Sequence, residues 1–76
     1  MAIVSDSQMN GVPRIEGSEV SVIEVYDATE QGVDPNQIAE WSPNITIADV
    51  YEALAYYHRN PQEMIEARRQ LDEMMR

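Results

Sequence analysis

The 76-residue chain contains no cysteine and no lysine, and His58 is its single histidine. The absence of cysteine excludes disulfide bonds and thiolate metal sites, and one histidine cannot form a multi-histidine metal site. No apolar run approaches the roughly 20 residues that a membrane-spanning helix needs, and the first ten residues lack a signal peptide's basic start and apolar core. We therefore expect a cytoplasmic protein without a metal, a cofactor or a membrane partner.

Fourteen acidic residues stand against five arginines, so the formal net charge is −9. This is the wrong sign for a nucleic-acid-binding protein, because contacts with phosphates supply most non-specific affinity. Two compatible interpretations remain, namely a basic protein partner and a halophilic origin, for which a lysine-free acidic surface is typical. In molar salt the Debye length falls to about 3 Å, which screens the self-repulsion. A chain this short forms one small domain with a modest core, so we expect a homodimer or another partner.

The stretch over 34–59 predicts a short helix, a tight turn and a longer helix. Asp34 is a predicted N-cap, with Pro35 in the first helical position and Gln37 able to complete a capping box. The turn contains Pro43, and Thr46 is the predicted N-cap of the second helix. The apolar face predicted for that helix contains Ile47, Val50, Tyr51, Leu54 and Tyr57 or His58. Such a helix-turn-helix binds nucleic acid in many proteins and is only a packing unit in many others.

Before this stretch, Ile3 and Val4 suggest a short strand, and a small hairpin is expected around Gly17, which can take the positive φ of a turn. Ser21 is followed three residues later by Glu24, a second capping-box pattern, and predicts a helix over about 22–31 that ends at Gly32. We expect Trp41, Tyr56 and Tyr57 to lie in the core or at an interface.

A last helix is predicted from Pro61 to near the terminus. It carries an apolar stripe at helical spacing, formed by Met64, Ala67, Leu71 and Met74 and widened by Ile65 and Met75. Packing on its own domain and docking of a partner are both open, and the partner-binding candidates are Met64, Ile65, Leu71, Met74 and Met75. Ion pairs at helical spacing are expected for Glu66 with Arg69, Arg68 with Asp72, and Arg69 with Glu73.

Catalytic residues are not evident. The serines have only His58 as a histidine base, and with fourteen carboxylates acidic pairs arise by chance, so we expect no enzyme. For contact with DNA, the exposed side of the helix after Thr46 would enter the major groove, yet it carries acidic residues. The nucleic-acid-binding candidates are Arg14, Tyr56 and Arg59.

Two runs of residues resemble the small prokaryotic proteins of the domain-of-unknown-function 433 family, over roughly Met9 to Glu63. Members typically read Gly-x-Pro-x-Ile-x-Gly-Thr-Arg-Ile, and later Pro-x-Leu-Thr-x-x-Asp-Val-x-x-Ala-Leu-x-Tyr. The first run is matched by Gly11, Pro13, Ile15 and Gly17, with Ser18 for Thr and Val20 for Ile. The second is matched by Pro43, Thr46, Asp49, Val50, Ala53, Leu54 and Tyr56, with Ile45 for Leu. Glu19 departs from the family's Arg, and Asn60 stands where His is frequent.

The resemblance implies a mainly α fold, a three- to four-helix, homeodomain-like helix-turn-helix bundle with a short N-terminal β element. Many members look like antitoxins encoded beside a ribonuclease toxin with a PIN-like fold. We therefore expect a non-enzymatic, antitoxin-like regulator, with residues 1–60 as the domain, residues 61–76 as an interaction segment, and DNA as a further candidate ligand. The alternative is an acidic adaptor that binds a protein and no nucleic acid.

Overall fold

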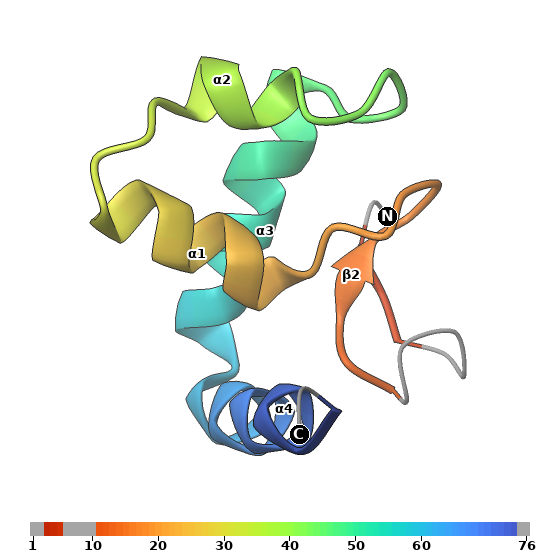
Figure 1. Cartoon of the computed structure of the whole chain (residues 1–76), viewed down its shortest axis with the longest axis vertical. Coiled ribbons are helices and arrows are strands. Elements are labelled where there is room, and N and C mark those ends of the chain that lie inside the picture. The colour runs from red at the N-terminus through yellow and green to blue at the C-terminus, as the bar shows by residue number, and fades with distance from the viewer. Residues whose placement is uncertain (1–2, 6–10, 75–76) are drawn as a thin grey trace.

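The computed structural model describes residues 3–5 and 11–74. These residues form two short strands and four helices (Figure 1). The elements are β1 (Ile3–Val4), β2 (Arg14–Ile15), α1 (Val22–Glu30), α2 (Pro35–Ala39), α3 (Ile47–Arg59) and α4 (Pro61–Met74). The expected mainly helical class with a short N-terminal β element is confirmed.

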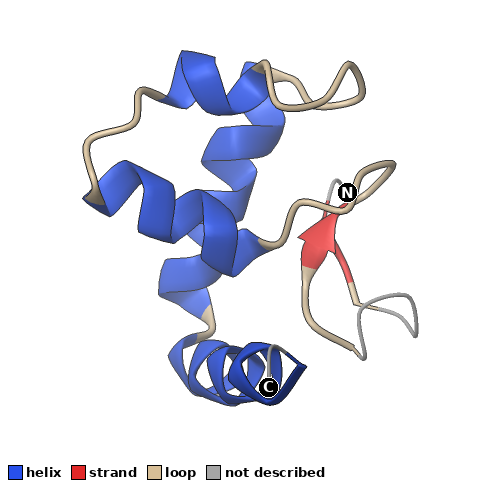
Figure 2. Ribbon diagram, viewed as in Figure 1, coloured by secondary structure: helices blue, strands red, loops and turns tan. Residues whose placement is uncertain are grey.

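Helix α3 is the centre of the fold, because α1, α2, α4 and both strands all contact it. In Figure 1, α2 lies at one end of the molecule and α4 at the other, with α1 crossing α3 between them. The strands lie to one side of the helices (Figure 2). Among the described residues, no helix combines the length and the apolar character needed to cross a membrane.

The helices begin where the capping residues predict. The Oγ of Ser21 accepts the backbone N–H of Glu24 at 3.0 Å, and the Glu24 carboxylate accepts the N–H of Ser21 at 3.1 Å. The same reciprocal capping box joins Asp34 with Gln37 and Thr46 with Asp49. Each box satisfies backbone donors that the first turn of a helix leaves unpaired. Helix α1 ends one residue before the expected position, and Gly32 follows it with a φ of +92°.

The β element differs in part from the expected hairpin. The regular partner of β2 is β1, with Ile3 opposite Ile15 and Val4 opposite Arg14 in an antiparallel pair. The expected turn is present, with Gly17 at a φ of +83°, but its second arm makes only one bridge, between Arg14 and Ser21. The arm is short because the chain enters α1 at the next residue.

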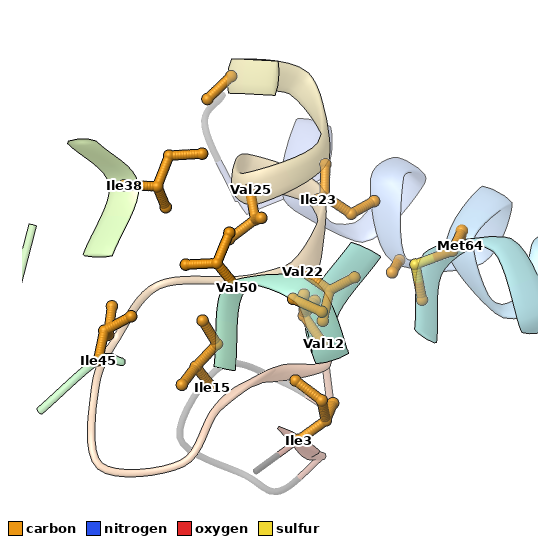
Figure 3. Close-up of a cluster of buried hydrophobic side chains, with 13 residues drawn as sticks. Ile3, Val12, Ile15, Val22, Ile23, Val25, Ile38, Ile45, Val50 and Met64 are labelled. Atoms are coloured by element: carbon orange, nitrogen blue, oxygen red, sulfur yellow. The ribbon is translucent and has the colours of Figure 1, made fainter. Parts of the chain in front are cut away.

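One hydrophobic core joins all six elements (Figure 3). Its buried members are Ile3, Val12, Ile15, Val22, Ile23, Val25, Ala28, Ile38, Ile45, Val50, Ala53, Met64 and Ala67. Because Met64 and Ala67 belong to this core, α4 is anchored on its own chain. Met64, predicted as a partner contact, is only 2% exposed in the folded chain and belongs to its own core.

The inward face of α3 also differs from the predicted one. Val50 and Ala53 are buried, whereas Ile47 and Tyr51 are 38% and 57% exposed. The side of α3 that carries Val50 and Ala53 faces α1 and α2, so Ile47 and Tyr51 lie outside the core. Trp41, which follows α2, is 47% exposed and is not a core residue.

Candidate protein-binding and nucleic-acid-binding surfaces

Arg68 fixes α4 to α1. Its Nη1 and Nη2 donate to the two carboxylate oxygens of Asp27, each at 3.0 Å, and Nη2 also lies 3.3 Å from the Tyr57 hydroxyl oxygen. The pKa of Arg68 is raised, first by the hydrogen bond to Asp27 and then by the one to Tyr57. The expected pair with Asp72 is thus wrong, because a carboxylate on the neighbouring helix offers both oxygens to the guanidinium fork.

The exposed side of α4 carries the other two predicted ion pairs. Arg69 donates to Glu66 and to Glu73, in the second case at 2.6 Å between Nη1 and Oε1. Both pairs are confirmed. They are solvent-exposed pairs at helical spacing, each contributing only tenths of a kcal/mol.

A hollow of about 330 Å³, which we call the α1–α4 groove, lies between α1 and the C-terminal half of α4. Its lining is Ile23, Glu24, Asp27, Arg68, Leu71 and Asp72. The lining therefore combines three carboxylates and one guanidinium with two aliphatic side chains. Met74 continues the same side of α4 three residues beyond Leu71, and it is 47% exposed.

A second hollow, of about 420 Å³, shares Arg68 and Asp72 with the α1–α4 groove and contains Ile65, which is 64% exposed. Its lining is Tyr57, Pro61, Met64, Ile65, Arg68, Arg69 and Asp72. Two arginines and one carboxylate line this hollow, so its charge balance is opposite to that of the α1–α4 groove.

The five partner-binding candidates are consequently not one surface. Met64 is in the core, Leu71 lines the α1–α4 groove, and Met74 lies three residues beyond Leu71 on α4. Ile65 is nine residues from Met74, which places it on the opposite side of the helix. Met75 lies outside the described residues. The α1 members of the groove were missed, because no local signal in the sequence shows that α1 and α4 are neighbours.

The three nucleic-acid-binding candidates do not come together either. Arg14, predicted to contact the nucleic-acid backbone, is only 7% exposed, and its Nη1 donates to the Ser18 carbonyl oxygen at 3.0 Å across the β turn. The Tyr56 hydroxyl donates to Glu63 at 2.6 Å. Burial, followed by this hydrogen bond, raises the pKa of Tyr56 to about 12. Arg59 alone of the three is exposed on α3.

Aromatic rings gather where α1 meets the end of α3. Tyr26 and Tyr57 stack with their centroids 3.7 Å apart, and His58 lies edge-on to both rings. We call the contact between Arg68 of α4 and Asp27 of α1 the clamp. The aromatic cluster supports it, because the Tyr57 hydroxyl also contacts Arg68. Within 3–5 and 11–74, no three His, Asp or Glu side chains are grouped so as to hold a metal ion.

Comparison with known proteins places the chain in a family. No curated protein and no solved structure matches it. The sequence profile of one family, described as Protein of unknown function (DUF433), matches residues 3–57, from β1 to the last turns of α3. Since the match spans more than half of the chain, the protein belongs to the family described as Protein of unknown function (DUF433).

Proposed function

We propose that this protein is a non-enzymatic regulator that acts by binding another protein in the α1–α4 groove. The observation that supports this most strongly is the chemistry of the groove, whose lining combines the aliphatic side chains of Ile23 and Leu71 with the acidic residues Glu24 and Asp72. A partner segment with an apolar side chain flanked by Lys or Arg complements both features. Opposite potentials on the two surfaces also speed association.

The resemblance described above suggests the class of partner. An antitoxin-like member of the family would neutralise a ribonuclease with a PIN-like fold. Ribonucleases bind the phosphates of RNA through basic surfaces, and an acidic chain of net charge −9 is complementary to such a surface. The proposed mechanism is therefore occlusion, in which the acidic protein covers the basic groove that RNA would enter.

DNA binding has less support in this chain. Of the predicted contacts, only Arg59 is exposed, and Glu52 lies on the same side of α3. At ordinary ionic strength that carboxylate opposes contact with a phosphate. The alternative proposal, an acidic adaptor that binds a protein and no nucleic acid, accounts for this face equally well.

The test uses two variants with the same change on opposite sides of α4. Met74→Arg places a positive charge beside the α1–α4 groove, and Ile65→Arg places one on the far side. RNA cleavage by the partner ribonuclease is measured as each full-length chain is added. We expect Met74→Arg to weaken inhibition at least tenfold and Ile65→Arg to inhibit like the wild type.

The opposite ranking would contradict the groove as the docking site. Trp41→Arg serves as a further control, because Trp41 is exposed and follows α2, at the end of the molecule away from α4 (Figure 1). Helical circular dichroism establishes that each variant is folded.

A further inference from the structure

The exposed side of α3 combines charges of both signs with tyrosine side chains. Glu52, Ala55 and Arg59 follow one another at spacings of three and four and share one side of the helix, with Tyr51 and Tyr56 beside them. Together with Ile3 and Asn60, these residues line a hollow of about 400 Å³. The ring of Tyr51 is more than half exposed at its edge.

We propose that this α3 face, formed by Tyr51, Glu52, Ala55, Tyr56 and Arg59, associates with the same face of a second copy of the chain. Two chains of charge −9 repel one another, so they can meet only where the charge cancels locally. Among the five residues of the α3 face, Glu52 and Arg59 carry opposite charges. The outer side of α4 instead adds Glu66, Glu73 and Asp72 to Arg69, so two copies meeting there would bring like charges together.

The order of the charges makes the α3 face complementary to itself. In an antiparallel pair with its two-fold axis between residues 55 and 56, Glu52 lies opposite Arg59 of the second copy, and Arg59 lies opposite Glu52. A two-fold interface repeats each contact, so this one pair of residues supplies two ion pairs. Parallel packing would instead place Glu52 beside Glu52 of the second copy, and Arg59 beside Arg59.

The side chains between the charges also suit this arrangement. Ala55, near the axis, leaves room in the hollow, and the exposed Tyr51 ring can enter the hollow of the other copy. Tyr56 is held in place by its hydrogen bond to Glu63. The α3 face shares no residue with the α1–α4 groove, so self-association and the proposed partner binding do not compete for the same residues.

The two-copy arrangement bears on nucleic acid as well. The α3 face is the side of the helix that would enter a DNA major groove, and association of two copies covers it. A dimer formed in this way would therefore not read DNA through α3.

The test is a charge exchange followed by the molar mass in solution, measured by sedimentation equilibrium of the full chain over a range of concentrations. Arg59→Glu puts two acids together at each end of the interface, and Glu52→Arg puts two arginines together. We expect each single variant to raise the dissociation constant at least tenfold, and the double variant E52R/R59E to restore association. The two positions are about 10 Å apart along one helix, which favours a contact between copies as the cause of restoration.

Arg69→Glu is the matched control, because it reverses an exposed charge on α4 and is expected to leave the molar mass unchanged. A wild-type chain that remains monomeric at millimolar concentration would overturn the proposal. So would a dimer that withstands both single variants, or one that the double variant fails to restore. These outcomes are independent of ribonuclease inhibition, so this proposal and the proposed function can fail separately.

Discussion

The clamp between Arg68 and Asp27 gives the most specific prediction for stability. We expect the coupling free energy between these two side chains, measured in a double-mutant cycle with Asp27→Asn and Arg68→Gln, to be about 1 kcal/mol. Two unit charges 4 Å apart interact by about 1 kcal/mol in water and about 4 kcal/mol at an effective dielectric of 20. The side chains are 41% and 42% exposed, which places the pair near the aqueous limit, and the two parallel hydrogen bonds favour the upper end of the range for surface pairs.

The assay is urea denaturation of the wild type, the two single variants and the double variant, followed by helical circular dichroism. A second cycle, with Arg68→Gln and Asp72→Asn, is the matched control, because Asp72 is the partner that helical spacing alone predicts. We expect a coupling near zero for that pair. A larger coupling for Asp72 than for Asp27, or a coupling below about 0.3 kcal/mol for Asp27, would refute the assignment of the clamp.

The remaining predictions concern a titration, a cap and the net charge. Tyr56 keeps its proton in the folded state up to about pH 12, whereas an unfolded tyrosine loses it near pH 10, so stability should fall as the pH rises through this window. Tyrosinate absorbance of the wild type and of Tyr56→Phe checks this assignment, and an ordinary titration of Tyr56 would contradict it. Ser21→Ala removes the buried cap of α1 and should lower the free energy of unfolding, measured in urea, by about 1 kcal/mol. Ser18→Ala, outside any helix cap, should lower the free energy of unfolding by less in the same assay. Raising NaCl from about 0.1 to 1 M shortens the Debye length from about 10 to 3 Å, so the melting temperature should rise, and a fall would show that ion pairs outweigh self-repulsion in this chain.

The sequence predicts the local features of the fold well. Ser21, Asp34 and Thr46 mark the starts of three helices, because a capping box is a contact between residues three apart and can be read within one short window. The position of Gly17 in a turn is predictable for the same reason.

The sequence does not predict the contacts between segments that lie far apart along the chain. Arg68 contacts Asp27, 41 residues away, and helical spacing favours the wrong partner on the same helix. The spacing of apolar residues predicts that α3 has an apolar stripe, but it does not fix how the helix is rotated about its axis relative to the core. Ile47 and Tyr51 were therefore expected to be buried, and they are exposed. Arg14 was a candidate for nucleic-acid contact because it is basic, yet its guanidinium donates to the Ser18 carbonyl oxygen across the β turn.

The same limit explains the candidate site. Leu71 and Met74 could be singled out from the sequence, because they belong to an apolar stripe on one helix. Ile23 and Glu24 could not, since they come to the groove only through the packing of α1 against α4. A surface built from two helices far apart in the chain requires the tertiary structure to be recognised.

The proposed function is tested by capture of the tagged full chain from its own cells at native salt, followed by RNA-cleavage assays of the protein that elutes with it. We expect a basic ribonuclease at one copy per chain, whose cleavage of RNA stops when the purified acidic protein is added back in equal amount. A bound protein without ribonuclease activity, or a ribonuclease that the added chain leaves fully active, would contradict it.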